Sequence, residues 1–297
     1  VLDVLVVFFQ QAGVNETQRA VMDELGMVFA AAAVGALVEA GRATHAGASW
    51  WPSLLAAAFP TLAQFAGVAV VHPLVARGLL HDDVAKHGVI TAKAKAKAQT
   101  SGGGGMPTDL VHLTAGVLTL AAFAVEGREF DRRVKEGPHA LDAGYLRGFL
   151  LRPIAPAFVA LLAPLVASPP SPAKTRVARL GVVAVYGGLG LAAFVKHMRG
   201  PVSALAASRL SVGDAFSTAV GTFLAFDFFW LVVSCAVWTA ALDGLDAQAV
   251  VPGNASFNTL MKECAARVVL AFVVGPATAL CCWGANRELE MWEEDIL

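Results

Sequence analysis

Long apolar stretches recur along almost the whole chain, and they limit its fold more than any other feature. A bilayer core about 30 Å thick needs roughly 20 mostly apolar residues for each helical span. Stretches of this kind follow one another with only short polar segments between them, so no soluble domain is left over. The candidate spans are Met22–Ala40, Trp51–Val75, Leu110–Glu126, Phe149–Ala167, Val177–Val195, Val212–Ala241 and Ala265–Trp283.

The composition supports the same conclusion. Hydrophobic residues make up 57% of the 297 residues and charged residues 15%, a balance that is rare in soluble domains. We therefore predict an all-α fold, a polytopic transmembrane helical bundle of about six to seven spans, with residues 1–297 forming one integral membrane domain. The sequence begins at Val1 rather than at a methionine, so we expect a processed product.

Charge and motifs exclude several classes of function. The net charge is −1 and no basic arm is present, which argues against a nucleic-acid partner. The chain lacks a histidine box, a GxSxG elbow, a Walker loop and an HExxH pair, and its last span has no lysine for a retinal. The four cysteines form no CxxC pair and are typical of reduced packing thiols. The sequence thus predicts a protein that is not an enzyme.

Two segments lie outside the spans. VLDVLVVFFQQ, at the start of the chain, is apolar but too short to span a bilayer, and we expect it to lie at the interface or against a neighbouring helix. Residues 91–107 join an Ala/Lys tract to four glycines, a low-complexity composition that is typical of a flexible loop. We expect another protein chain to hold this loop.

Prolines and small residues indicate how the helices pack. Pro60, Pro164 and Pro276 lie inside predicted spans, where neighbouring helices must satisfy the carbonyl groups that a kink frees. Lys and Arg residues divide evenly between the two sides of this topology, so they do not orient the bundle. Small residues four positions apart predict close helix contacts, and the pairs are Gly26 with Ala30, Ala31 with Gly35, and Ala184 with Gly188.

Asp227 interrupts the aromatic and aliphatic run FLAFDFFWLVV. It lies between Asp214 and Asp243, so it falls near the middle of the membrane if those two acids mark the interfaces. An ionised acid at that depth costs about 2.5–3.5 kcal/mol on insertion scales. We expect a neutral carboxylic acid that hydrogen-bonds a neighbour such as Thr222 or Ser234; the alternative is a functional acid that faces a polar cavity.

Several other polar side chains are candidates for ligands or helix clamps. His72, His112, His197 and Gln64 lie in or at the ends of spans, where each could ligate the magnesium of a chlorophyll or simply hydrogen-bond within the bundle. No other metal site is indicated. Glu39 and Glu126 each lie near an arginine at a helix end, Arg42 and Arg128, and interhelical Glu–Arg pairs there would join two helices.

The chain is rich in alanine and valine, and along its whole length it resembles in composition the polytopic accessory subunits of algal photosystem supercomplexes. The resemblance implies a non-catalytic accessory or scaffold subunit of a large complex in an organelle membrane, the thylakoid of a chloroplast. Chlorophylls and carotenoids would be its cofactors, and other membrane subunits and structural lipids its partners. The pigment-binding residues would then be His72, His112, His197, Gln64 and Asp227.

Two alternatives follow from the residues themselves. In the first, the protein is a secondary transporter that uses Asp227 as a proton or cation site near Pro- and Gly-interrupted helices. That hypothesis requires a water-accessible cavity at Asp227 and polar partners from other helices. In the second, weaker alternative, Lys196, His197 and Arg199 form a headgroup-level site of an enzyme that acts on lipids.

Overall fold

A computed structural model describes residues 2–14, 16–45, 51–87, 106–137, 140–151, 167–168, 172–199, 218–250 and 257–294. This part of the chain is helical, as predicted, apart from a parallel pair of two-residue strands. The elements in chain order are α1 (Leu2–Val14), α2 (Glu16–His45), α3 (Trp51–Ala66), α4 (Val68–His87), β1 (Met106–Pro107), α6 (Thr108–Glu136), α7 (Ala143–Leu151), β2 (Ala167–Ser168), α9 (Pro172–Arg199), α12 (Ala219–Val250), α13 (Phe257–Val274) and α14 (Pro276–Glu294).

Three helices of the described chain are long and apolar enough to cross a membrane. They are the segments Gln18–Gly41 of α2, Val177–Arg199 of α9 and Ala219–Gly244 of α12. Large apolar side chains also point outward, among them Phe226 and Trp230 of α12, as expected for helices in contact with lipid. A helical membrane bundle fits these findings, whereas the count of six to seven spans stays a prediction. Most of the predicted span Phe149–Ala167 and the loop 91–105 lie outside the described residues.

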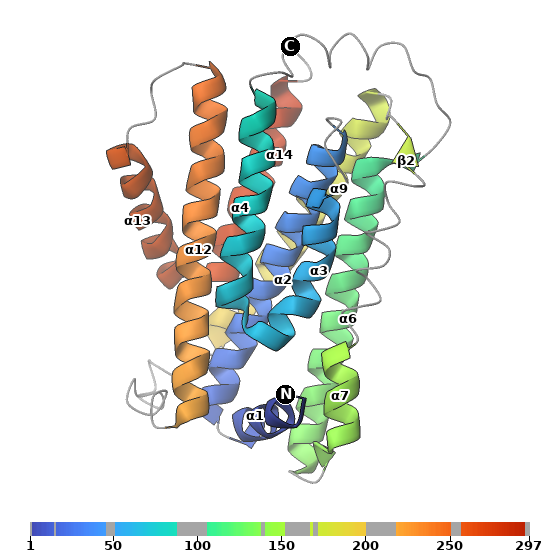
Figure 1. Ribbon diagram of the computed structural model, residues 1–297, viewed down its shortest axis with the longest axis vertical. Coiled ribbons are helices and arrows are strands. Elements are labelled where there is room, and N and C mark those ends of the chain that lie inside the picture. The colour runs from blue at the N-terminus through green and yellow to red at the C-terminus, as the bar shows by residue number, and fades with distance from the viewer. Residues whose placement is uncertain are drawn as a thin grey trace.

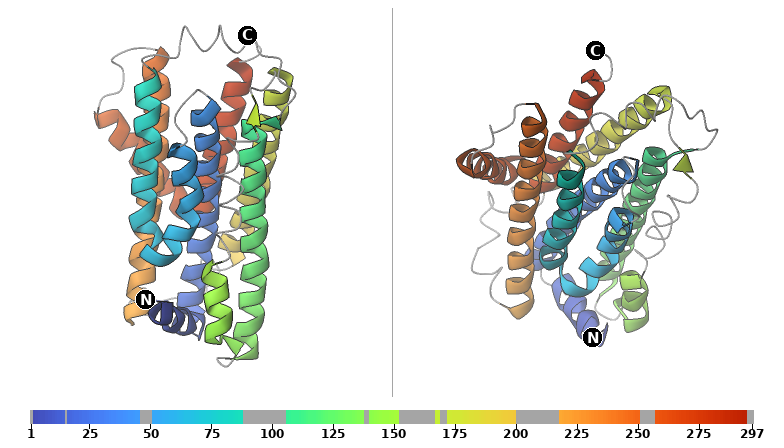
Figure 2. Two further views of the ribbon diagram at one scale, coloured as in Figure 1. Left: turned by 45° about the vertical axis from the view of Figure 1, so that its right-hand side comes forward. Right: turned by 45° about the horizontal axis from the view of Figure 1, so that its top comes forward.

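Two predicted spans are wrong, because each is broken into two helices by a glycine. Gly67 has a φ of 84° and separates α3 from α4, while Gly275 has a φ of 91° and separates α13 from α14. Glycine adopts positive φ without the steric cost that other residues meet. Figures 1 and 2 show that both breaks reverse the chain, so that α3–α4 and α13–α14 are antiparallel hairpins. The breaks lie at glycines, and Pro60 lies within the continuous helix α3.

The core forms around α2, which contacts α3, α4, α6, α9, α12 and α14. Its middle turns carry Ala31, Ala32 and Ala33, all fully buried, and such small side chains let six helices approach one backbone. Gly35 confirms the close contact that its spacing predicted, since a Cβ there would lie 3.0 Å from the ring of Trp238. Gly26 and Gly188 have no atom within 4 Å of that position, so they make no such contact.

The lower end of the bundle in Figure 1 is closed by α1, which lies across the long helices and packs on α2 and α7. The initial apolar segment therefore packs against its neighbours, one of the two predicted placements.

Below its apolar part, α6 carries a charged cluster in which Arg132 and Arg133 donate hydrogen bonds to Glu129. These bonds lower the pKa of the Glu129 carboxyl from its ordinary value of 4.5 to about 2.

Candidate functional site at two helix breaks

The break at Gly67 rests on Asp227. The backbone N–H of Val68, the first residue of α4, donates a hydrogen bond of 3.2 Å to Oδ2 of Asp227. A Cβ on Gly67 would lie 3.2 Å from Oδ1 of the same carboxylate and would crowd it, and the φ of 84° also favours glycine. The first N–H groups of a helix have no intrahelical acceptor, and its N-terminus carries a partial positive charge. Asp227 therefore caps α4 from a different helix.

The break at Gly275 rests on His197 of α9. A Cβ on Gly275 would lie 2.9 Å from Cγ of His197. The His197 ring reaches α2, where its Nδ1 lies 3.2 Å from Oε1 of Glu24, and both residues are buried. In the described part of the chain Nε2 of His197 is buried without a hydrogen-bond partner. The turn of α13–α14 thus covers a buried Glu–His pair that has one unused nitrogen.

Both breaks lie at about the same height in the bundle. α2 and α12 rise side by side from the lower end, and the contact of Gly35 with Trp238 fixes their register (Figure 1). Glu24 lies eleven positions before Gly35, and Asp227 lies eleven positions before Trp238. Because parallel helices rise equally per residue, Glu24 and Asp227 are level. We call Glu24, His197 and Asp227 the lower polar layer.

A second set of charged side chains lies above it, in which Glu39 and Arg287 are buried and Asp243 and Arg267 are partly exposed. Glu39 of α2 accepts a hydrogen bond of 3.1 Å from Arg287 of α14. Asp243 of α12 forms an ion pair with Arg267 of α13 and accepts a 3.0 Å hydrogen bond from Nε1 of Trp283. We call these five residues the upper polar layer. It joins α2, α12, α13 and α14.

The spacing of the layers shows where Asp227 lies. Positions 24 and 39 are roughly 22 Å apart along α2 at 1.5 Å per residue, less than the 30 Å of a bilayer core. Both layers therefore fit within one hydrocarbon thickness, and Asp227 lies at the edge of the slab between them. The expected central position relied on Asp214 as a marker, and Asp214 lies outside the described residues.

The sequence-predicted ligands have different surroundings. Nδ1 of His72 lies 2.7 Å from Oγ of Ser234 and its Nε2 lies 3.7 Å from Sγ of Cys235, so both ring nitrogens have neighbours within the bundle. Hydrogen bonding within the bundle was the second of the two roles predicted for His72. The side chains of Gln64 in α3 and His112 in α6 lie outside those that the structure describes. Among the described residues no group of three His, Cys, Asp or Glu side chains forms a metal site.

Sequence reasoning missed several partners. It proposed a backbone carbonyl or a hydroxyl such as Thr222 or Ser234 for Asp227. Ser234 contacts His72, and the backbone N–H of Val68 contacts Asp227. An interhelical Glu–Arg pair is present at Glu39, with Arg287 as the partner. The signal for the Val68 contact was the isolated glycine before it, which marks a possible helix start inside an apolar run.

Comparisons with known proteins give no match: no family model, no curated protein and no solved structure is similar to the chain. Function is therefore argued from the geometry of the site.

Proposed function

We propose that the protein is a secondary transporter for protons or small cations, and that the lower polar layer is its coupling site. One observation carries the proposal: both hairpin turns rest on buried titratable side chains, and these side chains lie at one height in the bundle. Transporters commonly bind ions where helices are interrupted, because the interruption exposes backbone groups and helix ends inside the membrane.

The chemistry of the layer suits proton exchange. Histidine gains and loses a proton in the physiological range more readily than other side chains, and the Glu24 carboxylate lies 3.2 Å from Nδ1 of His197 as a second proton-binding group. The buried Nε2 of His197 has no hydrogen-bond partner among the described residues, so it is a position at which a proton or a water molecule can be exchanged. Asp227 supplies a second carboxylate, whose charge the N-terminus of α4 stabilises.

The hairpins supply parts that can move. Glycines at positive φ absorb backbone rotation, so Gly67 and Gly275 are suitable hinges. Because the α13–α14 turn packs directly on His197, a displacement of this hairpin would change access to the Glu24–His197 pair. In this proposal, ions enter when the α13–α14 hairpin moves away from His197.

Flux measurements test the proposal. The protein is reconstituted in liposomes that contain a pH-sensitive dye, and proton flux is driven by a potassium diffusion potential. We expect flux above that of empty liposomes, a fall of at least tenfold in Glu24→Gln and His197→Gln, and no change in Glu290→Gln, which alters an exposed carboxylate of α14. If the protein carries no flux with protons, sodium or potassium, the proposal is wrong.

One observation favours a second candidate, the pigment-holding accessory subunit of a larger membrane complex. Nε2 of His197 has no hydrogen-bond partner among the described residues, and a histidine nitrogen of this kind can ligate the magnesium of a chlorophyll. The exposed apolar faces of α9 and α13 suit lipid or neighbouring subunits. Isolation in mild detergent separates the candidates, because this one expects co-purified pigment and partner chains, and loss of pigment in His197→Ala.

A further inference from the structure

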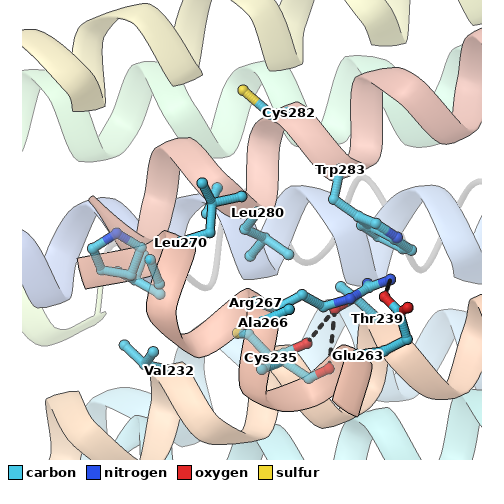
Figure 3. Close-up of a pocket in the computed structure, with 15 residues that line it drawn as sticks. Val232, Cys235, Thr239, Glu263, Ala266, Arg267, Leu270, Leu280, Cys282 and Trp283 are labelled. Carbon is cyan, nitrogen blue, oxygen red and sulfur yellow. Dashed lines mark hydrogen bonds and ion pairs between the residues drawn. The ribbon is translucent and has the colours of Figure 1, made fainter. Parts of the chain in front are cut away.

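A pocket of about 330 Å³ lies between α12, α13 and α14, with Val28 of α2 in its wall and Pro276 of the α13–α14 turn in its lining. Its volume falls at the lower end of the roughly 300–1,000 Å³ that small-molecule sites occupy. Figure 3 shows Arg267, Glu263 and Thr239 gathered at one end of the pocket and Val232 at the other, with Leu270 and Leu280 between them. The pocket is therefore amphipathic, with one polar end and one apolar end.

The polar end offers hydrogen-bond donors that nothing in the described chain accepts. Nη2 of Arg267 is used by the ion pair with Asp243, but Nε and Nη1 are buried without a partner. The hydroxyl of Thr239 donates to the carbonyl of Cys235 at 2.9 Å within its own helix. Leaving a buried donor unpaired costs about 1–3 kcal/mol, and more for a charged group. A ligand for this end must therefore bring an acceptor.

The charges around Arg267 favour an uncharged acceptor. Asp243 already neutralises the guanidinium, and the Glu263 carboxylate lies 4.0 Å from Nη2. An added carboxylate or phosphate would meet two acids beside one arginine, so the local field opposes it. An ester or amide carbonyl oxygen accepts from Nε–H or from Nη1–H without that repulsion.

The direction of the pocket matches that of a lipid in a bilayer. Asp243 lies at the end of the apolar segment Ala219–Gly244, so the polar end is near the membrane boundary. Val232 lies roughly 16 Å further into the segment at 1.5 Å per residue. Leu270 lines the pocket and is 47% exposed, which opens the apolar wall toward lipid.

We propose that this pocket binds an uncharged acyl lipid, whose ester carbonyl accepts a hydrogen bond from one of the two unpartnered nitrogens of Arg267, Nε or Nη1, and whose chain lies against α12 and α14. The site is independent of the transport proposal. Small side chains such as Ala266 and Ala279 form its walls and leave the space that the chain occupies.

Tryptophan fluorescence tests the site, because Trp283 lines the pocket. The full-length protein in detergent is titrated with a monoacylglycerol that carries bromine on its chain, a quencher of indole emission. We expect saturable quenching that Trp283→Phe removes. Arg267→Lys keeps the charge beside Asp243 but loses the planar fork, so it should weaken binding at least tenfold. Lys262→Gln, an exposed change on α13, should bind as the wild type does.

Two further arms make the result decisive. Ala279→Phe and Ala266→Phe fill the pocket from different helices, and each folded variant should lose saturable quenching. The fatty acid with the same brominated chain, titrated at pH 9, should bind at least tenfold more weakly than the ester. The proposal is overturned if quenching does not saturate, if both filled variants bind as the wild type does, or if the fatty acid binds as well as the ester.

Discussion

Asp227 of α12 accepts a hydrogen bond of 3.2 Å from the backbone N–H of Val68, the first residue of α4. The two residues are 159 positions apart, and their contact places a carboxylate at the end of a helix that has no acceptor of its own for that N–H. A residue that hydropathy marks as an anomaly is thus explained by the helix break beside it.

Removal of the carboxylate should destabilise the hairpin. In Asp227→Ala the N–H of Val68 loses its acceptor, and we expect the free energy of unfolding to fall by about 1–2 kcal/mol, the usual cost of a lost N-cap. Asp227→Asn keeps an oxygen that can accept the same hydrogen bond, so it should lose less than half as much. Thermal unfolding in detergent measures both. Equal stability of Asp227→Ala and the wild type would show that the contact contributes nothing.

Gly275 should tolerate a methyl group poorly, because its backbone conformation and its contact with His197 both oppose one. Gly275→Ala requires a φ of 91° from an L-residue, at a cost of roughly 1–2 kcal/mol, and it also brings the new Cβ to 2.9 Å from Cγ of His197. We expect a loss of at least about 2 kcal/mol of unfolding free energy, measured by chemical denaturation in micelles. Gly26→Ala is the matched control, because its Cβ meets no atom within 4 Å and alanine favours a helix.

Helix type could be predicted from the sequence, but chain direction could not. Apolar stretches identify helices because a helix satisfies its own backbone in lipid. A hydropathy window is the same for a helix that continues and for one that folds back, so the sequence predicts one span for Trp51–Val75 and one for Ala265–Trp283. The Gly–Pro pair at Gly275 and Pro276 carries the stronger signal, since glycine often ends a helix and proline often begins one, and the isolated Gly67 carries a weaker one.

The site was predicted less well, because its contacts join residues that are far apart in the chain. The candidates His72 and Asp227 are indeed buried, but Ser234 and Val68 are their partners through contacts of 162 and 159 positions. Glu24 was missed because it lies near the start of the predicted span Met22–Ala40, where an acid is expected to face the membrane interface. Glu24 is level with Asp227 only because of the register in which α2 packs on α12. The spacing of residues within either helix does not predict that register.

The buried pair of Glu39 and Arg287 should be costly to break from one side. Glu39→Gln leaves the guanidinium of Arg287 buried beside a neutral amide, and removal of one partner from a buried pair costs about 3–5 kcal/mol. Replacement of both, as Glu39→Gln with Arg287→Met, should restore part of that loss. A double-mutant cycle of unfolding free energies measures the coupling, and strictly additive losses would show that the two side chains do not stabilise each other.

The charged cluster on α6 should make the fold sensitive to acid. The pKa of Glu129 is lowered to about 2 by hydrogen bonds from Arg132 and Arg133, so its ionised form is favoured in the folded state. A depressed folded-state pKa gives a contribution that is fully present above the ordinary value of 4.5 and is lost as the pH falls toward 2. We therefore expect the melting temperature of the wild type to fall more steeply between pH 5 and pH 2 than that of Glu129→Gln, at low salt. Because the group is exposed, 1 M salt should reduce the difference, and identical slopes at low salt would contradict the prediction.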